Sequence, residues 1–137
     1  MASVILDTNI FVAAGFNSRS HSARIINLIK TNQLTLVWDQ STQRETKKII
    51  TQIPPLSWSQ VSPLFKSAHQ HLDQLDRQAY QFIPDPDDRK FAALAQATGA
   101  TLITNDDHLL AHRHHLTCPV MTPAEFFTQT KPTSSSS

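Results

Sequence analysis

A single cysteine and two glycines are all that this 137-residue sequence contains of those two residue types. One thiol, Cys118, cannot form an internal disulfide or a metal site built from several thiolates, and it suits a reducing compartment. The scarcity of glycine and the 39% of hydrophobic residues argue against a disordered chain. We expect one domain with its own core over residues 1–130, followed by a disordered, serine-rich tail over residues 131–137.

Long hydrophobic runs are also missing from the sequence. No apolar stretch approaches the length that is needed to cross a membrane. No positively charged leader precedes an apolar segment. Together these absences predict a cytoplasmic protein that does not bind or span a membrane.

The first apolar run ends in a polar cluster, at residues 4–9 (VILDTN). Because Val4, Ile5 and Leu6 are consecutive and do not alternate with polar residues, we expect a strand covered on both faces, as in a parallel sheet between helices. Ligands bind at the carboxyl ends of the strands in such sheets, and Asp7 lies at that end. The alternative interpretation is that Asp7 only caps the helix that follows.

The same arrangement recurs at residues 100–108, where an apolar strand leads into Asn105, Asp106, Asp107 and His108. Apolar runs predict further short strands over residues 34–38, 80–83 and 118–121. Apolar residues at helical spacing predict helices over residues 10–14, 20–30, 39–52, 57–74 and 85–99, and a last one after Thr122. This alternation implies a three-layer α/β/α fold around a central, mostly parallel sheet.

Glu45 lies in the helix that is predicted over residues 39–52. Glu45, Ile49 and Ile53 are spaced by four, so this carboxylate shares a helix face with residues that pack toward the core. An exposed pairing of Glu45 with Lys48, one turn further on, is the alternative interpretation.

A second acidic segment, residues 84–88 (PDPDD), opens a later helix. Asp85 suits the N-cap position and Pro86 the first helical position. Asp87 and Asp88 complement the helix dipole, and both lie near the apolar face of the helix. Capping therefore explains the segment locally, and the helical phase does not separate Asp87 from Asp88.

Two features near the C-terminus are interpreted without a catalytic role. Thr122-Pro-Ala-Glu125 has the pattern of a capping box with proline at the first helical position, so Glu125 is interpreted as structural. Residues 112–115 (HRHH) form a basic run that reads as solvated surface able to touch phosphates.

A net charge of +1 conceals an uneven distribution of the acids. Seven of the eleven acidic residues lie at the strand ends and helix starts described above: Asp7, Glu45, Asp85, Asp87, Asp88, Asp106 and Asp107. The other four acids stand against twelve Lys and Arg, a balance of +8 over the rest of the chain. An acidic, cation-binding centre within a basic surface suits a polyanionic substrate, although an ordinary solvated mixture of charges has the same composition.

These motifs, in this order and spacing, resemble the PIN domain nucleases. The resemblance runs through nearly the whole chain: residues 4–9, Ser41-x-x-x-Glu45, residues 85–91 (DPDDRKF), Thr104-x-Asp106 and residues 122–126 (TPAEF). It implies a pocket that holds Mg²⁺ or Mn²⁺ through the catalytic carboxylates Asp7, Glu45, Asp88 and Asp106. It also implies supporting polar positions, to which we assign Asn9, Thr104, Asp85 and Asp107.

One position departs from the pattern of that family. Many members have another Asp where this chain has His108, two residues after Asp106. The neighbouring carboxylate of Asp107 is able to compensate. The departure affects how strongly a second metal ion would be held, and the sequence leaves the number of metal ions open.

The resemblance implies an endonuclease that hydrolyses single-stranded RNA, acts as the toxin of a toxin-antitoxin pair, is covered by an antitoxin and forms a homodimer. RNA phosphates are expected to contact basic residues on the two acid-bearing helices: Lys47, Lys48, Arg89 and Lys90. One alternative is a non-catalytic RNA-binding module of the same fold. Another is a phosphatase with Asp7 as nucleophile, but that motif requires an Asp where this chain has Asn9.

Overall fold

The computed structural model, which describes residues 2–76 and 78–129, is built around one parallel sheet. Four strands lie in the order β2-β1-β3-β4, and all three pairings are parallel. Their bounds are β1 Ala2–Leu6, β2 Leu34–Leu36, β3 Thr101–Ile103 and β4 Val120–Met121. The predicted tail, residues 131–137, lies outside the described residues.

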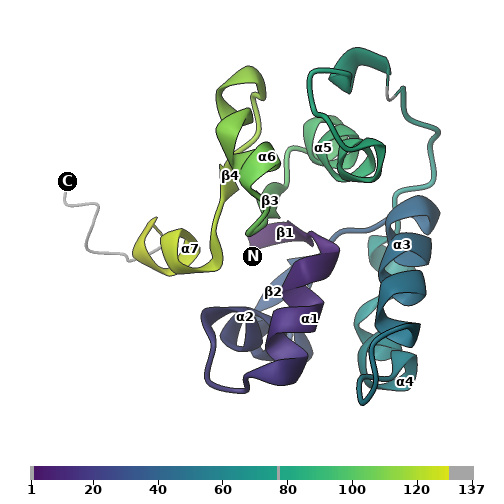
Figure 1. Ribbon diagram of the computed structural model, residues 1–137, viewed down its shortest axis with the longest axis vertical. Helices are drawn as coiled ribbons and strands as arrows, with labels where there is room; N and C mark the ends of the chain where they lie inside the picture. The colour runs from purple at the N-terminus through teal and green to yellow at the C-terminus, as the bar shows by residue number, and fades with distance from the viewer. Residues whose placement is uncertain (1, 77, 130–137) are drawn as a thin grey trace.

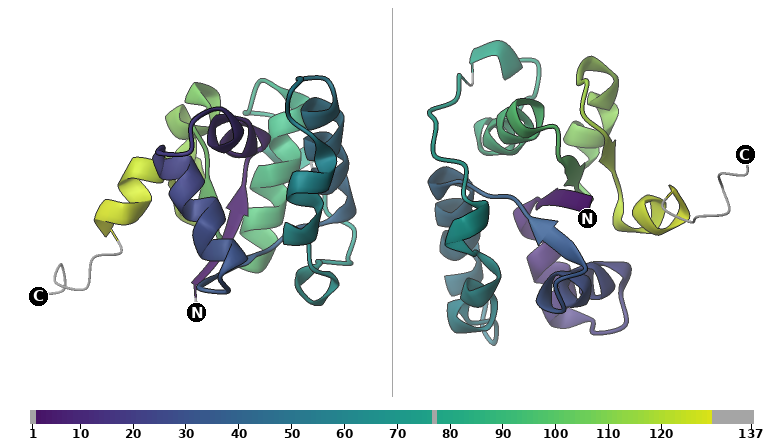
Figure 2. Two further views of the ribbon diagram at one scale, coloured as in Figure 1. Left: turned by 90° about the horizontal axis from the view of Figure 1, so that it is seen from below. Right: turned by 180° about the vertical axis from the view of Figure 1, so that it is seen from behind.

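Helices lie on both faces of this sheet (Figure 1). They are α1 Thr8–Phe16, α2 His21–Lys30, α3 Gln40–Thr51, α4 Trp58–Val61, α5 Pro86–Thr98, α6 Asp107–Ala111 and α7 Pro123–Gln129. Figure 2 shows α2 and α5 on opposite sides of β1, which confirms the predicted three-layer α/β/α architecture. Within the described ranges, none of these helices has both the length and the apolarity that a membrane crossing requires.

Strand β1 contributes to the packing on both faces of the sheet. Val4 and Leu6 pack with α1 and α2, whereas Ile5 packs with α5 on the other side. All three side chains are at most 2% exposed. Burying one such aliphatic side chain contributes about 1.5 to 3 kcal/mol, so the consecutive apolar residues of β1 hold the two helical layers together.

The strand predicted over residues 80–83 is wrong. Residues Gln78–Tyr80 form a 3-10 turn, and the amide of Ile83 donates to the carbonyl of Tyr80 at 3.0 Å. Ile83 is fully buried, but its own carbonyl accepts from Arg89 Nε at 2.8 Å. Because these backbone groups are satisfied locally, the segment packs against α5 without entering the sheet.

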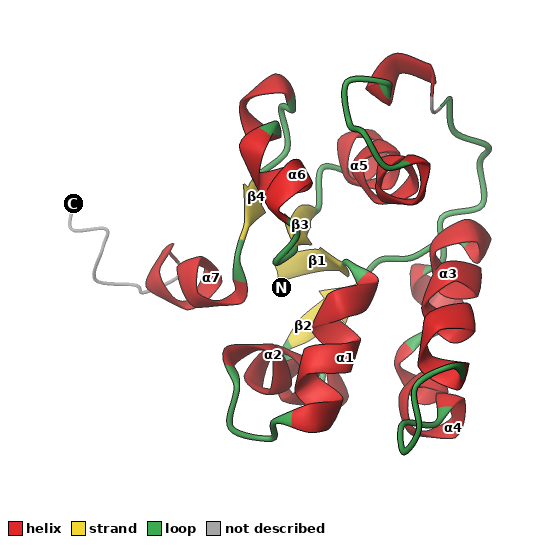
Figure 3. Cartoon of the chain, viewed as in Figure 1, coloured by secondary structure: helices red, strands yellow, loops and turns green. Residues whose placement is uncertain are grey.

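The helix predicted over residues 57–74 is also wrong in length. Only α4 is α-helical, and it is followed by the 3-10 turns Ser62–Leu64 and Ser67–His69. Figure 3 shows that most of the connection from α4 to α5 is loop. Several of its apolar side chains pack individually on the core, as Leu64 does with 4% exposure, whereas Leu72 is 81% exposed.

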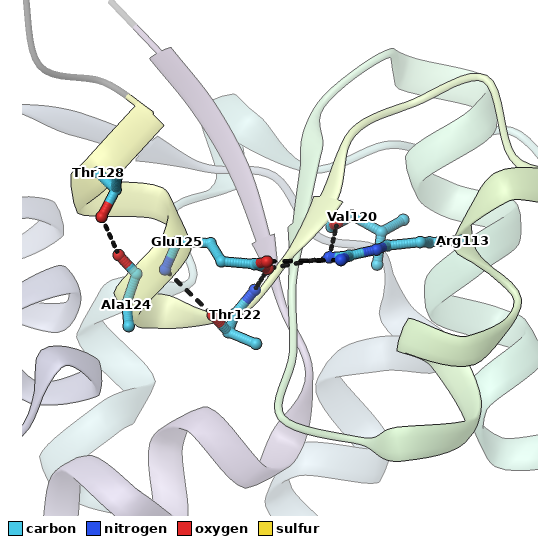
Figure 4. Close-up of polar contacts among 6 residues, drawn as sticks. All are labelled: Arg113, Val120, Thr122, Ala124, Glu125 and Thr128. Atoms are coloured by element: carbon cyan, nitrogen blue, oxygen red, sulfur yellow. Dashed lines mark hydrogen bonds and ion pairs between the residues drawn. The ribbon is translucent and has the colours of Figure 1, made fainter.

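Local capping predictions are confirmed at three helices. Asp39 caps α3, and Asp85 caps α5 by accepting from the amide of Asp87 at 2.9 Å. Gly99 ends α5 in the left-handed conformation with φ 74°, which suits a residue without a Cβ atom. At α7 the amide of Glu125 donates to Thr122 Oγ1, and Glu125 Oε1 accepts from the amide of Thr122 (Figure 4).

Candidate metal centre

The sheet register brings Asp7 and Thr104 together. Leu6 of β1 pairs with Ile103 of β3, so the residues that follow them leave the sheet side by side. Thr104 Oγ1 donates to Asp7 Oδ2 at 2.7 Å and accepts from the amide of Asp106 at 2.9 Å. Asp7 is 4% exposed and Thr104 is fully buried. One hydroxyl group therefore fixes the carboxylate after β1 and the backbone of the acidic turn after β3.

Asp106 has a structural contact through one of its carboxylate oxygens. Asp106 Oδ1 accepts from the amides of His108 at 2.8 Å and Leu109 at 3.1 Å, which caps α6. Leu109 is fully buried and anchors this short helix to the core. Capping by Asp106 uses only Oδ1, so it is compatible with a second contact through the other oxygen.

Asp88 enters the same region from the first turn of α5. It is 7% exposed, and within the described part of the chain its Oδ2 atom is buried without a hydrogen-bond partner. A buried, unsatisfied polar atom costs about 1 to 3 kcal/mol, and more when it is charged. The structure thus separates Asp88 from its neighbour Asp87, which is exposed on the same turn.

Glu45 reaches the site from α3. Its carboxylate lies 3.5 Å from Lys90 Nζ, and Lys90 Nζ also lies 3.6 Å from Asp87. The side chains of Glu45 and Lys90 are both 13% exposed. Among the described residues Glu45 therefore pairs across to α5 and not with Lys48 on its own helix.

A cavity of about 230 Å³ joins these acids. Its lining residues are Asp7, Thr8, Asn9, Glu45, Ile49, Asp85, Asp87, Asp88, Phe91 and Asp106. The predicted residues Asn9 and Asp85 thus face the same space as the four predicted catalytic acids. Thr104 lies behind Asp7 and does not line the cavity, and Asp107 is exposed at the start of α6.

One buried polar contact near the site was not predicted from the sequence. Thr46 is 1% exposed, and its hydroxyl lies 3.1 Å from the hydroxyl of Thr8. This hydrogen bond ties α3 to α1 beside Glu45. The only signal in the sequence is that a hydroxyl residue follows Glu45, a pattern too common to predict the contact.

The surroundings of Asp7 and Asp88 disfavour the ionised form of these two carboxylates. Burial, together with the charge of Asp106, raises the pKa of Asp7 from 3.8 to about 6, although the hydrogen bond from Thr104 opposes this rise. Burial raises the pKa of Asp88 from 3.8 to about 7, with the charges of Asp106, Asp7 and Asp85 adding to the effect. At both positions the loss of hydration on burial is the main reason that the charged form is disfavoured.

These residues fit a divalent cation. One ligand atom from each of Asp88, Asp106 and His108 lies within 4.8 Å of the others. The buried Oδ2 atom of Asp88 lacks a donor, and a cation beside it would remove the cost of its burial. Carboxylate oxygens are the ligands that Mg²⁺ and Mn²⁺ prefer.

A model of the PIN domain matches residues 3–108. The chain belongs to the PIN domain family. The matched span includes all four catalytic acids predicted from the resemblance: Asp7, Glu45, Asp88 and Asp106. No curated protein sequence matches the chain.

Two solved structures are similar to this PIN domain. VapBC2 from Rickettsia felis, bound to a DNA fragment from its promoter, aligns with a TM-score of 0.54 over 87% of this chain and 96% of the matched chain. FitAB bound to an IR36 DNA fragment aligns with a TM-score of 0.58 over 88% of this chain and 94% of the matched chain. The sequence identity is 16% in both, so the likeness establishes a shared fold.

Proposed function

We propose that this PIN domain protein is a Mg²⁺- or Mn²⁺-dependent endoribonuclease that hydrolyses single-stranded RNA. The observation that carries the proposal is the buried, unpartnered Asp88 Oδ2 in the cavity that Asp7 and Asp106 also line. Carboxylates gathered in this way are costly for the fold unless a cation offsets them. Family membership and the basic remainder of the chain support phosphodiester hydrolysis as the use of that cation.

A bound divalent cation supplies a Lewis acid, which lowers the pKa of water and offsets negative charge on a phosphate group. Asp7, Asp88 and Asp106 are the residues that would hold it. Thr104 orients the Asp7 carboxylate by donating to Oδ2. Glu45 is the fourth acid, and its pairing with Lys90 keeps its side chain at the cavity.

The four basic residues proposed to bind RNA differ in their contacts. Arg89 donates to the carbonyls of Ile83, Gln81 and Pro84, so its guanidinium orders the loop before α5. Lys90 is shared between Glu45 and Asp87. Lys47 and Lys48 are exposed on α3. Among the four, Lys47 and Lys48 are the residues most available to phosphates, and contact of all four with RNA stays a prediction.

The deciding experiment is cleavage of a mixed pool of single-stranded RNA by the purified protein, with Mn²⁺ and with EDTA. The matched inactive control is Asp106→Asn, because Asn also caps helices well and α6 should be preserved. We expect cleavage by the wild type with Mn²⁺ only. Cleavage that persists in EDTA, or that is equal in Asp106→Asn, would contradict the proposal. RNA binding without cleavage would identify the non-catalytic module instead.

The same proposal includes the biological setting that the resemblance implies. The protein is the toxin of a toxin-antitoxin pair, acts in the cytoplasm, and associates with an antitoxin and with a second copy of itself. The fold shared with VapBC2 and FitAB supports this setting. Light scattering of the purified protein tests the homodimer, for which the mass should be twice 15.4 kDa.

A further inference from the structure

His108 projects from the first turn of α6, beside the acids of the cavity. Its amide donates to Asp106 Oδ1, and the next residue, Leu109, is fully buried. The cap and the anchor fix the backbone of His108 on both sides, while its side chain is exposed. Asp106, which is itself an acid of the site, thus fixes the backbone from which the imidazole extends.

The three side chains Asp88, Asp106 and His108 are spaced as ligands of one ion are. One ligand atom of each lies within 4.8 Å of the others, and this is the only such group of three within residues 2–76 and 78–129. Ligands bound at about 2.1 to 2.3 Å lie at most about 4.5 Å apart, so a small side-chain movement would bring all three into contact. The buried, unpartnered Asp88 Oδ2 is an independent observation that favours a cation at this position.

We propose that the imidazole of His108 is a nitrogen ligand of the metal and that it favours Mn²⁺ over Mg²⁺. The inference rests on the proposed function, since it concerns the same cation. Both ions prefer oxygen ligands, but Mg²⁺ takes them almost exclusively, whereas Mn²⁺, as a first-row transition metal, accepts an imidazole nitrogen more readily. Asp88, Asp106 and His108 together offer oxygen and nitrogen ligands. With an Asp in place of His108, all three ligands would be oxygen atoms.

The neighbouring histidines have different surroundings. His112 Nδ1 lies 2.9 Å from the carbonyl of His108, and the His112 ring lies 5.8 Å from the ring of Phe82. The ring of His114 lies 4.1 Å from that of His115, on the exposed turn after α6. In the described part of the chain, the ring of His108 has no hydrogen-bond or ion-pair partner. His108 is therefore the histidine of this region whose ring lies beside the carboxylates of Asp88 and Asp106.

The first test is spectroscopic and needs no RNA. Untagged protein is loaded with one equivalent of Mn²⁺, and electron spin echo modulation is recorded to detect a ¹⁴N nucleus bound to the ion. We expect ¹⁴N modulation in the wild type and in the control His114→Ala, and its loss in His108→Ala and His108→Asp. Because His108 is exposed, both substitutions should leave the circular dichroism spectrum unchanged.

The second test compares affinities for the two ions. Calorimetric titration of the wild type and of His108→Asp gives the ratio of the Mg²⁺ and Mn²⁺ dissociation constants. We expect this ratio to fall by about tenfold or more in His108→Asp, because loss of a metal-bound imidazole should cost at least as much as loss of its supporting partners. Using the ratio cancels the effect of the added negative charge on both ions.

The outcomes separate the inference from the proposed function. Mn²⁺ binding with no ¹⁴N modulation in the wild type, or modulation that persists in His108→Ala, would overturn the role of His108. An unchanged ratio of dissociation constants in His108→Asp would overturn the selectivity. In each of these cases, cleavage that is stopped by EDTA would still support the proposed metal-dependent nuclease function. Absence of any Mn²⁺ binding would overturn the inference and the metal dependence together.

Discussion

Asp88 and Glu125 occupy the same position in two helices, yet their surroundings are opposite. Each is the third residue after its N-cap, and each helix has proline at its first position. Glu125 accepts from the amide of Thr122 and from Arg113 at 2.9 Å (Figure 4). These donors, the Arg113 guanidinium foremost, hold the pKa of Glu125 below its ordinary value of 4.5. Asp88 has an unpartnered oxygen and a pKa raised to about 7.

The comparison shows that a helix start does not by itself determine what a carboxylate does. Both residues complement the helix dipole, and both follow a local capping pattern. What differs is the number of donors that the tertiary structure supplies. A carboxylate surrounded by donors stabilises the fold, whereas one surrounded by other carboxylates is available to a cation. The predictions below test this distinction, in order of decreasing expected effect.

The largest effect is expected for Asp7→Asn. Loss of this buried acid should reduce metal-dependent RNA cleavage by about 100-fold or more, since even supporting partners of a metal site contribute up to that factor. Glu125→Gln is the matched control and should cleave normally, because it changes an acid outside the cavity. Rates are measured with Mn²⁺ on proteins with matching circular dichroism spectra. Near-normal cleavage by Asp7→Asn would show that Asp7 is not a catalytic acid. It would also contradict the distinction between carboxylates inside and outside the cavity.

A smaller effect is expected for Asp88→Asn on stability without metal. A shift of one pKa unit corresponds to about 1.4 kcal/mol, and water penetration and shared protonation reduce the total, so we expect a gain of roughly 2 kcal/mol at pH 8. That gain corresponds to a rise of roughly 7 °C in Tm for a chain of this size. The same substitution should reduce the stabilisation by Mn²⁺. Asp85 remains as the cap. A lower Tm in EDTA with an unchanged response to Mn²⁺ would assign Asp88 to the helix start.

The pH dependence of this gain has a definite sign. A raised carboxyl pKa means that the folded state binds more protons than the unfolded state between the two values. The contribution of Asp88 to the stability of the wild type should therefore decline as pH rises from 3.8 toward 7, the interval over which Asp88 is shifted. The Tm advantage of Asp88→Asn should shrink between pH 8 and pH 5. Thermal melts in EDTA measure it, and an advantage that is constant over this range would contradict the raised pKa of Asp88.

The smallest effect is expected for Glu125→Gln. Its side chain is 38% exposed and that of Arg113 is 43% exposed, so solvent screens their pairing and the loss should be at most about 1 kcal/mol. Because the pKa of Glu125 is lowered, its contribution is present above 4.5 and is lost as pH falls through the folded value. The difference from wild type should therefore be constant between pH 5 and pH 8. Salt titration of the Tm checks the screening, and a loss that is insensitive to salt would contradict it.

The sequence predicted those features of the fold that depend on local patterns. The consecutive apolar residues of β1 indicated a sheet covered on both faces, and Asp39, Asp85 and Gly99 marked helix ends correctly. Residues 80–83 were mistaken for a strand because apolar composition does not reveal that the amide of Ile83 is satisfied by Tyr80. Strand formation requires a free sheet edge, which is a property of the whole fold.

The same limit applies to the site. Helical phase did not separate Asp87 from Asp88; the family resemblance favoured Asp88, and the structure distinguishes them by burial. The pairing of Glu45 with Lys90 joins α3 to α5 and has no local signal. His108 was noted as a departure from the family pattern, but its proximity to Asp88 depends on how α5 and α6 pack on one face of the sheet.

The hydrogen bond between Thr104 and Asp7 joins residues 97 positions apart in the chain. A nascent chain that has emerged only through α3 carries Asp7 and Glu45 but neither Thr104 nor Asp106. Strand β3 must be synthesised and inserted beside β1 before the acids on either side of that hydroxyl can share a cation. The order of translation thus keeps the centre incomplete until most of the polypeptide has left the ribosome, so an unfinished or truncated product lacks the complete site.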